Sequence, residues 1–530
     1  MARYRACLCC ILLLMAALAP VRGQLGLNVD LYGQYNPGDG RASGSWGYAA
    51  PDGTEYALLG AQTGTAVVRI AAEGWLEEVA FIPGFPSNWR EIAVVGQHAY
   101  VVTEGNGSPH YGMQVISLEH LPDTAFLAAT YHETFTRGHI IQADIFEEAP
   151  FVYVCGTTAT QGVHILDVSD PLRPVEVGLY QPGYYIHDCH VRGDLLFAAA
   201  FFEATVDVLD ISERSNPQLI YRILDPGGNT HSVTTTADRH YLFVADELDG
   251  LPGRIFNIEN LAQPFEVATY TANPFSMVHN PYIFGDYAYI AHNAEGFRVV
   301  DIADPSTPVE VGFYDTFPMG MGGGNHGLWS AWPYLPSGKI IGGNREDGLY
   351  VWTFNGARAG RFYGQVIDSL SRQPLFNAMV SIAGTNALLR TDFEGRFRHG
   401  YLPGTYTMTV TLPGYAPKTI SVVLEAGSQE NLTIELSSLP TATAEAGGSA
   451  PVRAFPNPVA PGGRVVFEHA APIKAVRWYD AAGRPVQTHA ASVPSTTFEI
   501  AWGDWPAGLY WFVLVGEGGR VLGTGSLAGQ

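Results

Sequence analysis

The chain has 530 residues, which is too long for one ordinary hydrophobic core and favours about three or four domains. Charged residues make up only 15%, whereas 60 glycines, 35 prolines and 12% aromatic residues favour many short strands joined by turns. The formal net charge of −22 repels phosphate backbones, so we expect no nucleic-acid partner.

The N-terminus has the three parts of a secretory signal peptide. Arg3 and Arg5 precede an apolar run over residues 6–18, and small residues follow. We therefore predict that residues 1–23 are a signal peptide and that the mature protein is secreted or displayed on the outer-membrane surface. No later apolar run reaches the roughly 18 residues that a membrane span needs, so no transmembrane span is expected. Export would place Cys155 and Cys189 in an oxidising compartment, where a disulfide and two buried free thiols both remain open.

A four-strand unit recurs seven times between residues 24 and 355. Its clearest marker is a histidine that opens the first strand in five of the units. Successive histidines lie 48, 44, 48 and 47 residues apart, a period typical of propeller blades. In chain order, the residues that mark the seven first strands are Trp46, Arg90, His139, His187, His231, His279 and His326.

The other strands of each unit are read from apolar and alternating runs. The predicted second strands are residues 56–59, 99–102, 152–155, 195–199, 242–245, 288–291 and 339–341. The predicted third strands are residues 66–70, 113–118, 163–168, 206–211, 254–258, 297–302 and 349–354. A fourth strand follows a proline-containing turn, as in residues 175–180 and 309–314.

The seventh unit has no fourth strand of its own, because residues 355 and 356 lead into a different kind of sequence. Residues 28–35 resemble a fourth strand and have no blade of their own. We predict that residues 29–35 pair with residues 349–354, because this closes the ring and removes an exposed sheet edge. The sequence thus predicts a seven-bladed β-propeller.

Two strings within these units resemble the LVIVD repeat, namely VHILDVSDP over residues 163–171 and FRVVDIADP over residues 297–305. We interpret the aspartate of this repeat as a turn cap that bonds backbone amides two residues on. Further strings resemble the choice-of-anchor B family of secreted proteins built from the repeat: WGY at 46–48, EYAL at 55–58, WREI at 89–92 and PYLPSG at 333–338. The resemblance covers roughly the first 355 residues.

Residues 361–437 resemble a carboxypeptidase regulatory-like domain, a small transthyretin-like β-sandwich. The resemblance rests on GQVID at 364–368, TDFEGRF at 391–397 and LPGTY at 402–406. Aspartate–glycine and proline–glycine turns punctuate alternating strands here, in agreement with a sandwich. The segment holds no His-x-x-Glu zinc pair, so the resemblance implies a spacer or adhesive module rather than a peptidase.

Residues 438–453 form a linker of small and polar residues, and residues 454–530 follow it. AFPNP at 454–458, VVF at 465–467, WYDAAGR at 478–484 and PAGLYWFV at 506–513 resemble the type A C-terminal sorting domain of the type IX secretion system. The resemblance implies a β-sandwich that the secretion machinery recognises, which makes that machinery a partner. The tail would then be removed or replaced by a surface anchor.

The histidine series is the feature of the sequence that most resembles a site. We expect Arg90, His139, His187, His231, His279 and His326, with Asp188, to lie at one mouth of the propeller channel. Neutral imidazoles are common ligands of zinc, copper and iron, so His187, His231 and His279 are candidate ligands of a divalent metal ion.

A structural interpretation competes with the metal site. Each imidazole would then bond the backbone of the neighbouring blade, because every blade solves the same packing problem. We favour this structural role and expect no catalytic residues. The predicted function is a surface binding protein for a protein or glycan whose identity stays open, and the alternative is a metal-dependent hydrolase or lyase.

Overall fold

The computed structural model describes residues 26–529 apart from residues 106, 108–111, 319–322, 440–451, 461, 482 and 504. The expected signal peptide, residues 1–23, and most of the expected linker lie outside the described residues. The chain divides into two compact units, the first reaching to Gly360 with residues 400–403 and 425–428, the second holding the remainder. Within the described part, no helix is long and apolar enough to cross a membrane. Beyond strands, the described part has three short 3-10 turns: η1 (Ala72–Gly74), η2 (Phe201–Glu203) and η3 (Glu517–Gly519).

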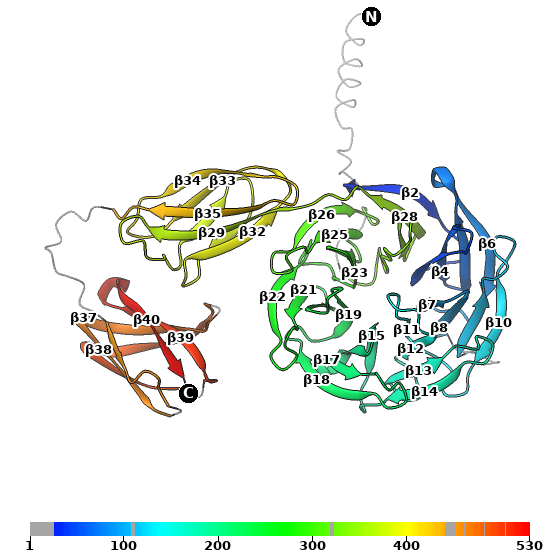
Figure 1. Cartoon of the computed structure of the whole chain (residues 1–530), viewed down its shortest axis with the longest axis horizontal. Coiled ribbons are helices and arrows are strands. Elements are labelled where there is room, and N and C mark those ends of the chain that lie inside the picture. The colour runs from blue at the N-terminus through cyan, green and yellow to red at the C-terminus, as the bar shows by residue number, and fades with distance from the viewer. Residues whose placement is uncertain are drawn as a thin grey trace, which may run out of the picture. The chain divides into compact units, whose positions relative to one another are not determined.

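Seven antiparallel sheets surround a central axis, which confirms the predicted propeller (Figure 1). The first three, from the innermost strand outward, are β3 (Ser45–Ala49), β4 (Glu55–Ala61), β5 (Gly64–Ile70), β6 (Leu76–Pro83); β7 (Arg90–Val95), β8 (His98–Thr103), β9 (Met113–Ser117), β10 (Phe126–Tyr131); and β11 (Ile140–Gln142), β12 (Phe151–Cys155), β13 (Val163–Asp167), β14 (Val175–Tyr180). The next three are β15 (Ile186–Arg192), β16 (Leu195–Ala200), β17 (Thr205–Asp210), β18 (Gln218–Leu224); β19 (Thr230–Thr235), β20 (Tyr241–Asp246), β21 (Gly253–Asn257), β22 (Phe265–Tyr270); and β23 (Asn280–Phe284), β24 (Tyr287–Ala291), β25 (Phe297–Asp301), β26 (Val309–Tyr314).

The seventh blade is closed by the N-terminal strand, as predicted. β2 (Val29–Tyr35) pairs antiparallel with β28 (Gly348–Phe354), with Val29 opposite Phe354 and Tyr35 opposite Leu349. β28 in turn pairs with β27 (Ile340–Asn344). One further pairing was not predicted. β1 (Gly26–Leu27) adds to the outer edge of blade 6 by pairing with β26, so the chain start is joined to two blades.

The innermost strand of blade 7 differs from the prediction. A strand opening at His326 was expected, but the structure has isolated bridges that join Leu328 to Asn344 and Trp332 to Ile341. Gly327 has a φ of +79°, which breaks an extended strand before Leu328. Pro333 follows Trp332 and has no N–H to continue the ladder.

The aspartate of the repeat caps its turn, as interpreted from the sequence. The Ser169 N–H donates to Asp167 Oδ1 at 2.8 Å, and the Ala303 N–H donates to Asp301 Oδ1 at 3.0 Å. Ser212 makes the same bond in blade 4. The repeated aspartate is therefore architectural.

The regulatory-like segment forms two sheets, which confirms the predicted sandwich. The order is β32-β29-β35 in one sheet and β31-β30-β33-β34 in the other. Val366 and Ile434 from the first sheet and Val380 and Val410 from the second are buried. The strands are β29 (Gly360–Asp368), β30 (Met379–Ile382), β31 (Leu388–Arg390), β32 (Arg396–Tyr401), β33 (Gly404–Thr411), β34 (Lys418–Leu424) and β35 (Gln429–Leu436).

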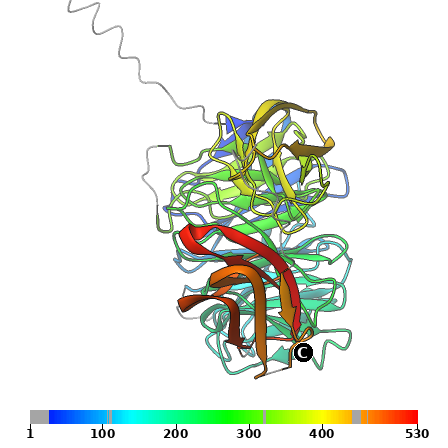
Figure 2. The same ribbon diagram turned by 90° about the vertical axis from the view of Figure 1, so that its left-hand side faces the viewer.

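The C-terminal segment forms one five-stranded sheet in the order β36-β37-β39-β40, with β38 also paired to β37; its strands are the orange to red ribbons of Figure 2. The two long strands β37 (Arg464–Tyr479) and β38 (Pro485–Ala501) pair in two stretches, because their register breaks between Glu468 and Ile473. Phe467 from the first stretch and Trp478 from the second lie in one buried cluster, so the strands bend around a shared core. The strands are β36 (Arg453–Phe455), β37 (Arg464–Tyr479), β38 (Pro485–Ala501), β39 (Gly508–Val515) and β40 (Val521–Gly529).

Candidate functional site

Local irregularities at the start of the innermost strands present the histidines to the channel. In β15, Ile186 pairs with Ala200 and Asp188 with Ala199, so His187 is an extra residue in a β-bulge. His231 is the extra residue at the equivalent point of β19. A bulge re-aims its side chain out of the pleat, which is why bulges are frequent next to functional sites.

Four histidine rings form a continuous row across blades 3 to 6, which we call the stack although neighbouring ring planes are inclined by 38° to 64°. The ring centroids of His139 and His187 lie 4.4 Å apart, those of His187 and His231 4.1 Å, and those of His231 and His279 4.2 Å. Trp329 of blade 7 extends the stack, 4.3 Å from His279. The sequence therefore identified four neighbouring members of one cluster.

His326 does not belong to this cluster. Its side chain is 47% exposed, its Nδ1 lies 2.9 Å from Glu346 Oε1, and its ring stacks on Phe317. Trp329, three residues later, takes the position expected for His326. Because blade 7 lacks a regular inner strand, the residue that matches the histidines of the other blades is Trp329 and not His326. The repeat period alone could not reveal this shift.

Arg90 also lies apart from the histidine stack. Arg90 pairs directly with Thr103, so its strand has no bulge at this point. The guanidinium donates from Nε to the Ala61 carbonyl at 3.1 Å and from Nη2 to the Phe85 carbonyl at 2.7 Å. Burial lowers the pKa of Arg90 to about 10. The side chain therefore supports loops of the first two blades rather than the channel mouth.

Asp188 lies under the stack as a buried carboxylate. It accepts a bond from Gln142 Nε2 at 3.1 Å and from the Cys189 N–H at 2.7 Å. Burial raises the pKa of Asp188 to about 6, and burial likewise raises that of Glu91 to about 7. Cys189 and Cys155 are both free and buried, which answers the question that the sequence left open.

Backbone carbonyls of the next blade fix the tautomers of two imidazoles. His187 Nδ1 lies 3.1 Å from the His231 carbonyl oxygen, and His279 Nδ1 lies 3.3 Å from the Trp329 carbonyl oxygen. A carbonyl only accepts, so each Nδ1 carries the proton and each Nε2 holds a lone pair. These bonds agree with the structural interpretation of the repeated histidine, yet they also leave the Nε2 atoms available.

The pKa of the imidazole changes along the stack. Burial lowers the pKa of His187 and His231 well below the usual value and that of His279 to about 3, so these rings are neutral. Burial acts on His139 in the same direction, but its 2.8 Å bond to Glu104 and further carboxylates outweigh burial and raise its pKa. The pKa values therefore differ along the stack, raised at His139 beside Glu104 and lowered at the other three rings.

Glu247 joins His187, His231 and His279, although the sequence marks it only as a charge at the end of a second strand and not as a member of the histidine site. One nitrogen each of His187 and His231 and a carboxylate oxygen of Glu247 all lie within 4.8 Å of one another. His279 Nε2 lies 4.0 Å from Glu247 Oε1. Glu247 and Glu104 each directly follow the second strand of their blade, and this shared position is the sequence signal that could have found them.

A pocket of about 510 Å³ opens in front of the stack, and we call it the channel-mouth pocket. Aromatic rings line one wall, where Tyr185 and Phe202 lie 6.0 Å apart and Phe201 and Phe202 4.9 Å apart. Phe202 is 75% exposed. The remaining lining is polar or charged: Trp89, Glu104, His139, Gln161, Tyr184, His187, Glu203 and Glu247.

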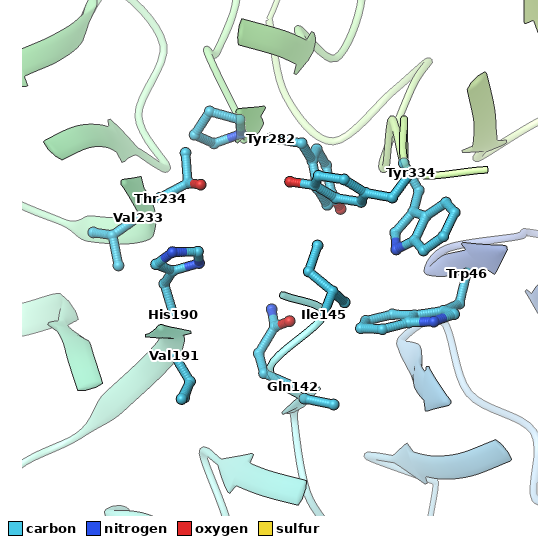
Figure 3. Close-up of a pocket in the computed structure, with 12 residues that line it drawn as sticks. Trp46, Gln142, Ile145, His190, Val191, Val233, Thr234, Tyr282 and Tyr334 are labelled. Atoms are coloured by element: carbon cyan, nitrogen blue, oxygen red, sulfur yellow. The ribbon is translucent and has the colours of Figure 1, made fainter. Parts of the chain in front are cut away.

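A second, smaller pocket of about 40 Å³ lies further along the same inner strands. In Figure 3, Gln142, His190, Thr234 and Tyr282 come from four different blades and surround it. Trp46, which the sequence aligned with the histidines, lies on this pocket instead. Its volume suits a water molecule rather than a substrate.

Comparison with known families identifies two parts of the chain. The sequence profile of the LVIVD repeat matches residues 151–181, 185–225 and 279–316, which are blades 3, 4 and 6. The profile of the carboxypeptidase regulatory-like domain matches residues 361–437. The chain is therefore a propeller-like repeat protein with a carboxypeptidase regulatory-like domain, and these two resemblances are confirmed.

The curated relatives match a short stretch of the chain. Carboxypeptidase D of Homo sapiens is 37% identical over 99 residues, which is 18% of this chain and 7% of that protein. Carboxypeptidase N catalytic chain of Mus musculus is 38% identical over 61 residues, which is 12% of this chain and 13% of that protein. The chain thus spans only a small part of the length of these relatives.

Solved structures with a similar course of the chain include the periplasmic gluconolactonase of Pseudomonas aeruginosa, with a TM-score of 0.39 and 12% identity over 49% of this chain and 82% of that one. A functionally unknown protein from Desulfotomaculum acetoxidans has a TM-score of 0.39 and 13% identity over 49% of this chain and 83% of that one. Similarity at this level carries no functional argument.

Proposed function

We propose that this chain is an exported binding protein that holds a neutral glycan in its channel-mouth pocket. The observation that carries the proposal is the aromatic wall beside polar acceptors. Phe202 is 75% exposed, although burying it would be favourable in a protein without a partner. Glu203 and Glu247 line the same pocket.

The chemistry of this pocket suits a sugar ring. An aromatic face packs on the apolar C–H face of a sugar, and carboxylates accept bonds from its hydroxyl groups. Glu104, Glu203 and Glu247 would repel a phosphorylated or sulfated ligand. A protein loop that carries no glycan is the competing ligand.

Replacing Phe202 with alanine tests the aromatic wall. We expect Phe202→Ala to weaken glycan binding about 10- to 100-fold, because stacking an aromatic side chain contributes about 1.5–3 kcal/mol. Stability should stay within about 0.5 kcal/mol, since the side chain is exposed. The measurement is a screen of neutral glycans on an array, followed by calorimetry with the best ligand in EDTA.

Phe265→Ala is the matched control for this variant. Phe265 lies in the outermost strand β22 and is 57% exposed, so its loss should leave binding unchanged. An equal loss of affinity in both variants would contradict the proposed pocket. If the chain binds a protein but none of the glycans, the ligand of the pocket is a protein and not a glycan.

We also propose that residues 1–23 direct the chain across the inner membrane and that residues 454–530 are a type A sorting domain of the type IX system. The motifs AFPNP, WYDAAGR and PAGLYWFV support this proposal, as does the all-β fold of the C-terminal segment. The choice-of-anchor B resemblance of the propeller agrees with display at the cell surface. The secretion machinery would then be the partner of the C-terminal domain.

Removing the C-terminal domain tests the export route. We expect a chain ending at residue 439, expressed in a bacterium with a type IX system, to remain in the periplasm. Fractionation and protease accessibility of intact cells measure the outcome. The control is a chain that lacks residues 361–437, which keeps both proposed signals and should reach the surface. Surface display of the chain that ends at residue 439 would refute the sorting role.

A metal-dependent hydrolase or lyase is the second candidate function. The observation that favours it is the approach of His187, His231 and His279 to Glu247 beside the pocket. Chemical change of a ligand on incubation with the protein would support this candidate function. The activity would require a metal ion bound by these side chains.

A further inference from the structure

Three neutral imidazoles and one carboxylate converge at the inner end of the channel-mouth pocket. His187 and His231 each place one ring nitrogen within 4.8 Å of the other and of a Glu247 oxygen. His279 approaches Glu247 Oε1 to 4.0 Å with its Nε2. The four side chains come from three consecutive blades, so the propeller closure holds them together.

An orphaned acceptor points into this cluster. His279 is fully buried, and among the described residues its Nε2 has no hydrogen-bond partner. Its Nδ1 is occupied by the Trp329 carbonyl, so Nε2 is a lone pair without a donor. A buried acceptor without a partner is costly unless an ion or another group completes it.

The same arrangement prepares the imidazoles as ligands. A metal-bound histidine usually donates its other ring N–H to a carbonyl or carboxylate, which fixes the tautomer and orients the ring. His187 and His279 both make this bond to the backbone of the next blade.

The spacing requires a closure of the cluster. Ligands about 2.1 Å from a tetrahedral ion lie about 3.4 Å apart, whereas the ligand atoms of His187, His231 and Glu247 lie within 4.8 Å of one another. Glu247 can supply part of this movement, because it follows the end of β20 and its side chain is 21% exposed. The imidazoles must also turn toward the ion, because a shift of Glu247 does not shorten the distances between the ring nitrogens.

The donor atoms also indicate the kind of ion. Three imidazole nitrogens and one carboxylate oxygen suit zinc and its neighbours in the transition series, whereas calcium and magnesium prefer oxygen ligands throughout.

We propose that His187, His231, His279 and Glu247 form a binding site for a divalent transition-metal ion of the zinc type. The ion would face the channel-mouth pocket, because His187 and Glu247 also line that pocket. This inference is independent of the glycan proposal, which is measured in EDTA.

The test uses the full mature chain, stripped of metal and titrated with Zn²⁺ and Co²⁺. We expect one ion per chain by calorimetry and elemental analysis, and Co²⁺ should give the visible absorption of a four-coordinate site. His279→Ala should weaken Zn²⁺ binding at least about 100-fold and abolish that absorption. Glu247→Gln, which keeps the size of the side chain, should weaken binding about 10- to 100-fold.

His326→Ala is the matched control. His326 also adjoins a glutamate, yet it lies outside the stack and is half exposed, so its loss should leave Zn²⁺ affinity unchanged. Thermal unfolding of each metal-free variant shows whether it is folded. If His279→Ala does not fold, Glu247→Gln tests the site in its place. The proposal is overturned if the wild-type chain binds less than a tenth of an equivalent. Equal affinity in wild type and Glu247→Gln would overturn it too.

Discussion

A chain that begins at residue 36 should lose its closed propeller, whereas a chain that begins at residue 28 should keep it. The longer chain lacks only β1, which extends a blade that already has four strands. The shorter chain also lacks β2, the outer strand of blade 7. Comparing the two truncations therefore separates the effect of losing the closing strand β2 from the effect of losing β1.

The expected effect is large because β2 joins the two ends of the ring. β2 covers the edge of β28, whose Trp352 is fully buried and stacks on Phe297 at 4.8 Å. The Tyr32 hydroxyl of β2 also donates to the Ala71 carbonyl of blade 1 at 2.8 Å. Without β2 an apolar strand edge is exposed, and exposed edges pair with other chains.

Size-exclusion chromatography and urea unfolding of the two chains measure the difference. We expect the shorter chain to form aggregates or to unfold at a much lower urea concentration. Equal elution volumes and equal unfolding midpoints would show that closure through β2 does not stabilise the propeller.

The outer parts of the blades could be predicted from the sequence because their signals are local. The predicted strand at 195–199 is β16 (Leu195–Ala200), and the predicted strand at 163–168 is β13 (Val163–Asp167). Alternation, turn residues and the aspartate cap all act within one hairpin. β1 (Gly26–Leu27) could not be predicted, because two residues carry no period.

The candidate site was predictable in part for the same reason. The 44- to 48-residue period located His139, His187, His231 and His279, because each lies at the start of the innermost strand of its blade, with a bulge at His187 and His231. Bulges depend on the pairing partner and leave no mark in a single strand. The period therefore could not distinguish His326 from Trp329.

Glu247 shows a second limit of sequence reasoning. It directly follows β20, where a charged side chain is usually solvated, and its sequence neighbours give no sign of burial. The approach of His187, His231 and His279 makes it part of a cluster. Contacts between blades are set by the ring as a whole.

Arg90→Leu should destabilise the propeller by about 2–6 kcal/mol, because two backbone carbonyls each lose a hydrogen-bond partner at a cost of about 1–3 kcal/mol. Arg90 is fully buried, and its guanidinium donates to the Ala61 and Phe85 carbonyls. Leucine fills much of the space but cannot donate, so both carbonyls lose a buried partner. Ligand binding at the channel mouth should be unchanged in the fraction that folds.

Two further variants make this expectation specific. Arg90→Lys should recover part of the stability, because an ammonium group can reach one carbonyl but cannot span two as the planar guanidinium does. Arg173→Ala removes an arginine whose side chain is 84% exposed in its ion pair with Asp170, and it should change stability by less than about 1 kcal/mol. Urea unfolding measures all three. A loss of ligand affinity in Arg90→Leu without a loss of stability would return Arg90 to the binding site that the sequence suggested, because a structural residue must act through folding.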